Sequence, residues 1–376
     1  MRIAHITYTY FPLVGGGDVY VENLRRALEA RGHPQVVLAR RSRETAPWVV
    51  AARNPLRGLP AEFWTHVLGL IARAPVLWTQ DAIIAHYPIY ALAAMALAPG
   101  RRIIGISHGV TWDDRPGSVR SGIKKALARA AFRRCAAFVA NDTNFLREMG
   151  LDLKPGTRFF EQVAPGRWFI PNCVDTERFQ PGRGWQQLRA LRPIMVPRNL
   201  FFNRGVHLVI TAFAQFHRAH PDPRLVIVGA TAQPRYARAL RELVRRLGLQ
   251  DDVVFWGSVA HTDMPTVYAA AEMVVIPSVA GEGTSLSALE AMACGIATVS
   301  TNIGGLADLP TYQCAPDAAS MARAMTEVYA RRGQVGVGQL AEVRRSFSRQ
   351  RWEDAWSRVI ESFEPSGQQE PTRVMQ

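Results

Sequence analysis

Cysteine is scarce in this chain of 376 residues, which contains four. They stand far apart, at Cys135, Cys173, Cys294 and Cys314, and form neither a C-x-x-C pair nor any other spacing that would clamp zinc. We therefore expect neither a disulfide framework nor a zinc site. Scattered cysteines favour a reducing compartment, and we expect a cytoplasmic protein.

Long hydrophobic runs are also missing. The longest apolar stretches, such as residues 89–98, are much shorter than the roughly 20 residues needed to cross a bilayer. The first residues lack the charged-then-apolar order of a signal peptide and are typical of a buried strand. The sequence therefore predicts neither a membrane span nor a leader.

Lysine is also scarce, because the chain contains 3 lysines and 42 arginines. Its formal net charge is +14. The first 176 residues hold 23 Lys and Arg against 13 Asp and Glu, a net +10, and the remainder 22 against 18, a net +4. Such an excess calls for an anionic partner or a solvated basic face. A protein that binds nucleic acid or a membrane surface is therefore one class to weigh.

Much of the excess lies in residues 118–135, where cationic and apolar side chains predict an amphipathic helix with a cationic face. The cationic residues are Arg120, Lys124, Lys125, Arg129, Arg133 and Arg134, and the apolar ones are Ile123, Leu127, Ala131 and Phe132. Two interpretations stay open: the helix lies on an anionic membrane, or it packs on the core and leaves its basic face in water. No nucleic-acid partner is expected, because the charge is spread and lacks a stripe of stacking aromatics.

Short apolar runs alternate with helical patterns along the chain, which predicts parallel sheets covered by helices on both faces. The expected strands are residues 3–8, 36–39, 82–86, 103–107 and 136–141, and then 193–199, 224–230, 252–258 and 273–278. A stretch with Pro and Gly, residues 169–185, separates the two series. Ligands of such sheets bind at the carboxyl ends of the strands, so we expect the chemistry in a cleft between two α/β halves.

The length suits two domains, which we place at residues 1–170 and 171–345. Residues 346–364 are expected to form a C-terminal helix and residues 365–376 a disordered tail. The helical pattern itself covers residues 344–363 and puts four apolar residues on one side, Trp352, Trp356, Val359 and Phe363.

Two loops with candidate phosphate chemistry follow the first strand of each half. Gly15, Gly16 and Gly17 precede a helix, whose first N–H groups can bind a phosphate. The triple glycine matches neither the dinucleotide spacing nor the P-loop, and a plain turn stays an alternative. In PRNLFFNRG, residues 197–205, Arg198 and Arg204 offer several donors to a diphosphate, although a surface role stays open for either.

The most specific segment runs from a buried strand through a loop into a helix, over residues 273–295. Its loop carries Glu282, and Glu290 follows inside the helix. Carboxylates accept hydrogen bonds from the vicinal hydroxyls of ribose or sugar, and the N–H groups of residues 283–286 lie at a helix start, where they favour phosphate.

These motifs, in this order, resemble those of glycosyltransferase family 4, a retaining family. The resemblance extends from residue 3 to about residue 360. Its segments are VGGGDVYVENLRRALEARGH, FIPNCVDTERF, RNLFFNRG, EGTSLSALEAMACG and STNIGG. The resemblance implies an α/β fold of the GT-B type, in which two Rossmann-like domains face each other across a cleft and a C-terminal helix returns to the first domain.

The resemblance also implies a nucleotide-diphosphate sugar as co-substrate, with no cofactor and no metal. The arginines would bind the diphosphate, and Glu282 and a histidine at a strand end would face the transferred sugar. The implied catalytic residues are His108, Arg198, Arg204 and Glu282. The implied donor-binding residues are Gly15, Gly16, Gly17, Gly257, Val259, Gly283, Thr284, Ser285, Leu286 and Glu290, the last for the ribose.

The resulting hypothesis is a retaining, metal-independent hexosyltransferase that acts on a hydroxyl of a saccharide or lipid-linked acceptor, for polysaccharides of the cell envelope. The basic helix favours an acceptor at the inner face of the membrane. A GT-B epimerase and a phosphorylase are alternatives, but the lysines, Lys124, Lys125 and Lys154, all lie outside the second half, where a pyridoxal lysine would be needed. Arg204 replaces the usual lysine of the family, and Thr284 a frequent aromatic residue.

Overall fold

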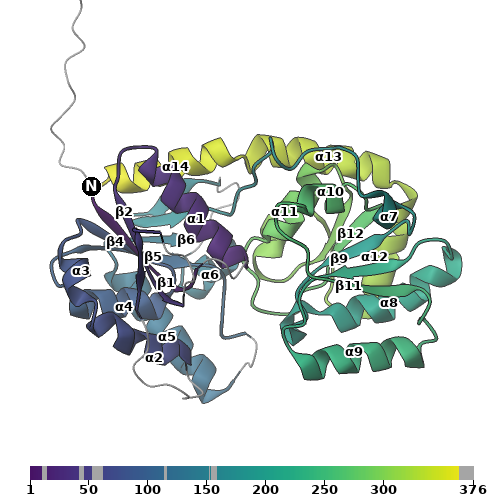
Figure 1. Cartoon of the computed structure of the whole chain (residues 1–376), viewed down its shortest axis with the longest axis horizontal. Coiled ribbons are helices and arrows are strands. Elements are labelled where there is room, and N and C mark those ends of the chain that lie inside the picture. Colours follow the sequence, from purple (N-terminus) through teal and green to yellow (C-terminus); the bar gives the residue numbers. More distant parts are fainter. Residues whose placement is uncertain are drawn as a thin grey trace, which may run out of the picture.

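The chain forms two α/β lobes, each built on its own sheet (Figure 1). The computed structural model describes residues 1–10, 15–41, 46–52, 62–113, 117–151, 153 and 159–363, without the side chains of residues 41 and 62–65. The expected tail, residues 365–376, lies outside the described residues.

The first sheet has the strand order β3-β2-β1-β4-β5-β6-β8-β7, and every neighbouring pair is parallel except β7 with β8. Its strands are β1 (Ile3–Thr9), β2 (Gln35–Arg41), β3 (Val49–Ala51), β4 (Ala82–Ala85), β5 (Arg102–Ser107), β6 (Ala137–Ala140), β7 (Glu161–Ala164) and β8 (Arg167–Phe169). The helices of this lobe are α1 (Gly16–Glu29), α2 (Glu62–Ile71), α3 (Ala74–Trp78), α4 (Pro88–Leu97), α5 (Val119–Arg134) and α6 (Thr143–Glu148).

The second sheet is parallel throughout and has the order β11-β10-β9-β12-β13-β14. Its strands are β9 (Ile194–Pro197), β10 (Leu225–Val228), β11 (Val253–Gly257), β12 (Met273–Ile276), β13 (Thr298–Thr301) and β14 (Tyr312–Cys314). The helices here are α7 (Gln186–Arg189), η1 (Phe202–Arg204), α8 (Val206–Ala219), α9 (Pro234–Arg246), α10 (Met264–Tyr268), α11 (Leu286–Ala293), η2 (Gly304–Asp308) and α12 (Ala318–Ala330).

Within each lobe the first six strands follow the same order, in which the third, second and first strands precede the fourth, fifth and sixth. In such a sheet the strand order reverses between the first and fourth strands, which is where ligands of Rossmann-like folds bind. The reversal lies between β1 and β4 in the first lobe and between β9 and β12 in the second. The expected fold of two Rossmann-like domains is confirmed.

The central strands are buried on both faces, which explains their continuous apolar sequences. On β4, for example, Ile83 packs on one side of the sheet with residues of α4 and α5, and Ile84 packs on the other with residues of α1. Both isoleucine side chains are fully buried. Among the described residues, no helix is long and apolar enough to span a membrane.

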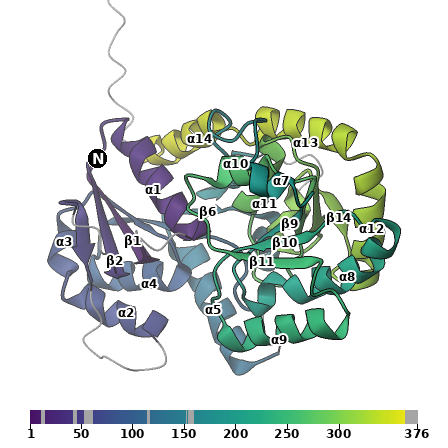
Figure 2. The ribbon, with the colours of Figure 1, turned by 45° about the vertical axis from the view of Figure 1, so that its right-hand side comes forward.

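The chain returns to the first lobe through α13 (Arg332–Ser346) and α14 (Arg349–Glu361), which run along one edge of both lobes (Figures 1 and 2). The buried Trp352 and Trp356 of α14 pack with the first-lobe core around Tyr20. The returning helix is confirmed, but the prediction of one helix over residues 344–363 is wrong. The helix breaks at Phe347 because this residue accepts a backbone hydrogen bond from Val174 (3.0 Å), which draws the chain into an extended bridge.

Candidate active site

The predicted site residues come together where the carboxyl ends of strands from both lobes meet. Arg198 directly follows β9 and Glu282 follows β12, the two strands at the reversal of the second sheet. From the first lobe, His108 directly follows β5, and Gly16 begins α1 after β1. A Cβ atom on Gly16 would lie 3.7 Å from Leu286 Cδ1 at the start of α11, so the two helix N-termini approach each other across the lobes.

A cluster of charged side chains surrounds the buried Glu282. Arg198 donates to Glu282 Oε1 (3.1 Å), whereas Arg204 and the Ser278 hydroxyl (2.8 Å) donate to Oε2. Arg198 also donates to Ser285 Oγ (3.0 Å), the N-cap of α11. The cluster thus ties the loop after β9 to the loop after β12 and places two guanidinium groups beside one carboxylate.

The net charge of this cluster suits a diphosphate. Burial alone would raise the pKa of the Glu282 carboxyl, but Arg198 and Arg204 outweigh burial and hold the pKa below its ordinary value. Glu282 is therefore anionic at neutral pH, and two cations against one anion leave a positive excess in a site of low dielectric constant. Arg198 Nε is buried and has no hydrogen-bond partner among the described residues, so this arginine keeps a donor to offer.

Glu290 lies within the first turns of α11, where it is buried, and its carboxylate is held by two neighbours. His261 Nε2 lies 2.8 Å from Glu290 Oε1, and the Tyr268 hydroxyl donates to Oε2 (3.0 Å). A carboxylate has about four lone-pair directions, so these two contacts leave acceptor capacity for hydroxyl groups. The remaining predicted donor residues of this lobe, Gly257 and Val259, lie at the end of β11 and just beyond it.

Gly283 and Thr284, just before the N-cap of α11, form a contact between the lobes. The buried Thr284 donates its hydroxyl hydrogen to Asn141 O (3.1 Å) and accepts from Asn172 N (2.8 Å). A Cβ atom on Gly283 would lie 2.6 Å from His108 O, closer than any side chain can approach. Only glycine permits this backbone contact.

Two aspartates also accept hydrogen bonds across the lobes. The Asp113 carboxylate accepts from Gly281 N (2.9 Å), and the Asp308 carboxylate accepts from Thr143 N (2.8 Å) and its hydroxyl (2.5 Å). We call this contact zone the seam. It comprises His108, Gly109, Asp113, Asn141, Thr143 and Asn172 on one side, and Gly281, Gly283, Thr284 and Asp308 on the other.

The glycine loop of the first lobe is held by Asp18. This buried carboxylate accepts from Gly15 N (3.0 Å) and from the Thr9 hydroxyl (2.7 Å), and so caps the start of α1. Capping fixes the loop that brings Gly16 and Gly17 toward the second lobe. The residues before Gly15 in this loop lie outside the described ranges.

Comparison with known proteins places both lobes in one family. Residues 14–156 match the family model described as Glycosyltransferase Family 4, and residues 194–331 match that of Glycosyl transferases group 1. The chain is 35% identical over 318 residues to D-inositol 3-phosphate glycosyltransferase of Segniliparus rotundus, which covers 78% of this chain and 70% of that protein. The chain belongs to glycosyltransferase family 4.

Other relatives of this glycosyltransferase agree with that assignment. Glycogen synthase of Mycobacterium tuberculosis is 27% identical over 373 residues, covering 87% of this chain and 86% of that protein. Among solved structures, sucrose-phosphate synthase of Thermosynechococcus elongatus superposes with a TM-score of 0.80 at 19% identity, over 96% of this chain and 98% of that one. WaaG, a glycosyltransferase involved in lipopolysaccharide biosynthesis, gives 0.72 at 16% identity, over 95% and 99%. The resemblance drawn from the motifs, and with it the GT-B fold, is confirmed.

The sequence did not single out several polar residues that this glycosyltransferase places at the site. Asn141 follows β6 and Asn172 lies in the FIPNCVD segment, and the side-chain oxygen of each is buried without a partner among the described residues. Ser278 and His261 each hold one of the two glutamates. The position of Asn141 just after an apolar strand was a usable signal, because polar residues at strand carboxyl ends are where ligands bind.

Proposed function

We propose that this glycosyltransferase moves a hexose from a nucleotide-diphosphate sugar to an acceptor hydroxyl, with retention of the anomeric configuration and without a metal ion. The observation that carries the proposal is the cluster of the buried Arg198 and the half-buried Arg204 around Glu282, beside the N-terminus of α11, which the N-terminus of α1 approaches. Two guanidinium groups and two helix N-termini would neutralise the departing diphosphate. Relatives named as a phosphatidylinositol N-acetylglucosaminyltransferase subunit and a phosphatidylinositol monomannoside mannosyltransferase support transfer of a sugar to a lipid-linked acceptor.

Each group has a defined task in this proposal. Arg198 and Arg204 would turn from Glu282 toward the phosphate oxygens, and Glu282 would accept from hydroxyls of the transferred sugar. Glu290 would accept from the ribose hydroxyls, and His108 would contact the sugar from the first lobe. The leaving phosphate would take the proton of the acceptor hydroxyl, so no enzymatic nucleophile is required. Retention is implied by the likeness to the retaining family, and the anomeric configuration of the product, measured by NMR, tests it.

Nucleotide binding is the first test. One of UDP, GDP and dTDP, at a hundredfold excess over its Kd, is expected to raise the melting temperature by roughly 5 °C. Glu290→Ala should abolish that rise because the ribose loses its acceptor. Glu242→Ala, an exposed glutamate on α9, is the matched control and should keep it. If no nucleotide changes the melting temperature while anionic vesicles do, the proposal fails.

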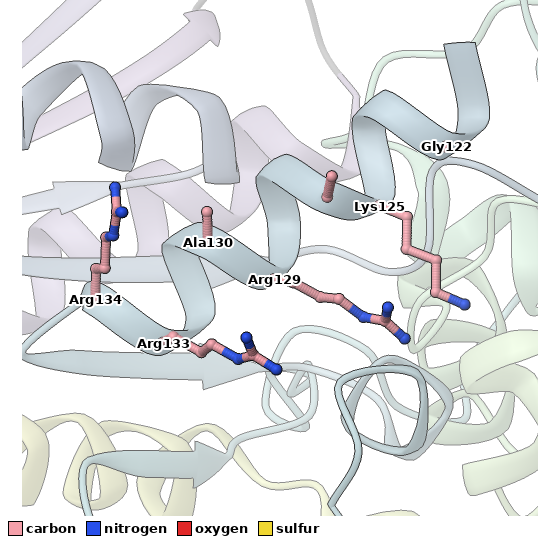
Figure 3. Close-up of a pocket in the computed structure, with 7 residues that line it drawn as sticks. Gly122, Lys125, Arg129, Ala130, Arg133 and Arg134 are labelled. Carbon is pink, nitrogen blue, oxygen red and sulfur yellow. The ribbon is translucent and has the colours of Figure 1, made fainter. Parts of the chain in front are cut away.

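The acceptor side of the proposal rests on α5. Lys125, Arg129 and Arg133 extend from the same side of this helix and line an open hollow of about 550 Å³, with Arg134 at its end (Figure 3). Near the start of the helix, Val119 is 81% exposed and Ile123 is 50% exposed. Apolar side chains beside arginines, all facing water, are typical of a surface that rests on an anionic membrane. We therefore propose that this enzyme is cytoplasmic and binds peripherally to membranes that carry its acceptor.

This membrane contact makes a separate prediction. Arg129→Gln with Arg133→Gln is expected to weaken binding to vesicles rich in phosphatidylglycerol about thirtyfold, since each cation near the surface contributes about 1 kcal/mol. Arg323→Gln with Arg344→Gln makes the same charge change on exposed residues of α12 and α13, away from α5, and should leave binding intact. Equal losses in the two pairs would show that net charge alone attracts the vesicles, and the α5 surface would then have no special part.

A further inference from the structure

Three histidines, the buried His5 and His86 and the half-buried His108, lie side by side at the candidate site. His5 is on β1, His86 directly follows β4 and His108 directly follows β5, and these three strands are neighbours in the first sheet. The His5 and His86 rings stack at 5.4 Å between centroids, and the His86 and His108 rings at 5.6 Å with planes 3° apart. His5 and His86 are 0% and 1% exposed, so neither ring can exchange its partners for water.

The rings are joined through their nitrogen atoms. His5 Nδ1 lies 3.1 Å from His86 Nε2, and His86 Nδ1 lies 3.4 Å from His108 Nε2. At the far end, His5 Nε2 lies 2.7 Å from Gln35 Oε1. The result is one chain of hydrogen bonds from Gln35 on β2 to His108 at the seam.

The direction of the hydrogens in this chain follows from its far end. The Gln35 amide donates from Nε2 to the carbonyl oxygen of His33 (2.7 Å), so its oxygen must face His5. An amide oxygen only accepts, and His5 Nε2 must therefore carry a hydrogen, which leaves His5 Nδ1 as an acceptor in a neutral ring.

The same rule applies at each following ring. Because His5 Nδ1 accepts, its partner His86 Nε2 must carry the hydrogen, and the neutral His86 ring then has no hydrogen on Nδ1. His86 Nδ1 therefore accepts in turn, so its partner His108 Nε2 must carry a hydrogen. His108 Nδ1 is then left without a hydrogen. The carbonyl group of His33, at the other end of this chain of hydrogen bonds, thereby determines which nitrogen of His108 can accept.

We propose that Gln35, His5 and His86 are positioning residues that hold His108 in one tautomer, with Nε2 protonated and Nδ1 available to accept a hydrogen bond from a hydroxyl of the transferred sugar. The inference rests on the proposed function in one respect, the meeting of His108 with the sugar. A sugar hydroxyl that donates to a fixed acceptor is bound in one rotamer, which orients the ring for transfer.

The surroundings keep the rings neutral and in place, as the chain requires. Burial lowers the pKa of His108 and of His5 to about 4, and burial together with the neighbouring rings lowers the pKa of His86 well below 6.5. A protonated ring would present two donors and break the chain. The rings of Tyr20 and His108 meet edge to face with their centroids 4.8 Å apart. The Tyr20 hydroxyl accepts from Trp356 Nε1 (3.2 Å) of the returning helix α14.

Histidine side-chain NMR tests the tautomer directly. Long-range proton–nitrogen spectra of the nitrogen-15-labelled, full-length enzyme near neutral pH distinguish a protonated Nε2 from a protonated Nδ1. We expect His5, His86 and His108 to be protonated at Nε2 alone. His66 provides an internal reference with the opposite tautomer, protonated at Nδ1. Its Nδ1 lies 3.1 Å from the carbonyl oxygen of Ala52 and must donate to it.

Two replacements of His86 separate the hydrogen bond from the packing. His86→Leu removes the acceptor for His108, whereas the side-chain oxygen of His86→Asn can take the place of Nδ1. In His86→Leu we expect His108 to show both tautomers and kcat/KM for the donor to fall about tenfold, the cost of one neutral hydrogen bond. His86→Asn is expected to keep the Nε2 form of His108 and recover most of the activity, and His66 should be unchanged in both.

The outcomes separate the two ideas. If His108 keeps a single Nε2 tautomer in His86→Leu, or if the native enzyme shows a mixture, the positioning role is wrong. Equal loss of activity in the leucine and asparagine variants with an unchanged His108 tautomer would also overturn it, because packing alone would then explain the loss. The NMR measurement of the tautomer needs no nucleotide sugar, so its result does not depend on the proposed function. If His108→Leu keeps full transfer activity, only the proposed contact of His108 with the sugar is contradicted.

Discussion

Replacing Arg198 by methionine is expected to lower the transfer rate about a thousandfold, the effect of removing a preorganised donor from the charge that develops in the transition state. Methionine fills a similar volume but offers no hydrogen-bond donor to the diphosphate that leaves in the proposed reaction. Steady-state transfer with a nucleotide sugar identified by thermal shift measures the loss. Arg245→Met, which breaks an exposed pair with Glu242 on α9, is the matched control and should retain full activity.

The same substitution is expected to destabilise the fold in a way that depends on pH. In the native chain the pKa of Glu282 lies below its ordinary value of 4.5, so the ionised carboxylate stabilises the fold above that pH, and this contribution is lost as the pH falls through the lowered pKa. Without Arg198, burial dominates and the pKa rises. The free energy of unfolding should then be lower than in the native chain near pH 7, and this difference should shrink as the pH falls below 4.5.

A double variant distinguishes catalysis from the cost of the buried charge. Glu282→Gln combined with Arg198→Met removes both charges, so most of the lost stability near pH 7 should return. Transfer should stay low, because the diphosphate still lacks its arginine. If the double variant regains activity together with stability, Arg198 acts through the fold and not through the departing diphosphate.

The parts of the fold that could be predicted are those that local sequence determines. Strands such as β4 and β10 are apolar on both faces, and so they stand out as short continuous runs. Edge strands β3, β7 and β14 are only partly buried and carry no such run, so they were not expected. β13, with the sequence TVST, is fully buried, yet its polar residues conceal it. Thr298 there is satisfied by Gln339 of α13, 41 residues away, a partner that no local pattern reveals.

The candidate site, like the fold, could be predicted from the sequence only in part. The motifs indicated that Arg198, Arg204 and Glu282 would lie near one another, because all three follow strands of one sheet. The pairing of both arginines with Glu282 itself was not predicted, since the motifs assigned these charges to different parts of the donor. His5 and His86 gave no signal either, because each is a lone histidine in or next to an apolar strand. Their contact depends on β1, β4 and β5 being neighbours, which is a property of the strand order.

Replacing Gly283 by alanine is expected to lower transfer about a hundredfold while nucleotide binding changes little. The added Cβ would lie 2.6 Å from His108 O and 2.7 Å from Asn141 Oδ1, and His108 O belongs to backbone directly after the buried strand β5, which is costly to displace. The lobes would have to separate at the seam, which would move the N-terminus of α1 and His108 away from the charge cluster. A misplacement of reacting groups by about 1 Å can lower the rate about a hundredfold. The nucleotide contacts proposed for Arg198 and Glu290 lie within the second lobe and would remain.

Small-angle X-ray scattering and transfer assays together test this prediction. With saturating nucleotide, Gly283→Ala should keep a larger radius of gyration than the native enzyme. Gly338→Ala is the control, because a Cβ at that exposed position of α13 would meet nothing within 4 Å and alanine favours the helix. If Gly283→Ala closes like the native chain and still transfers sugar at the native rate, the seam contributes nothing to catalysis. If it fails to close and also fails to bind nucleotide, the donor contacts must extend into the first lobe, and Gly15 to Gly17 become the residues to test next.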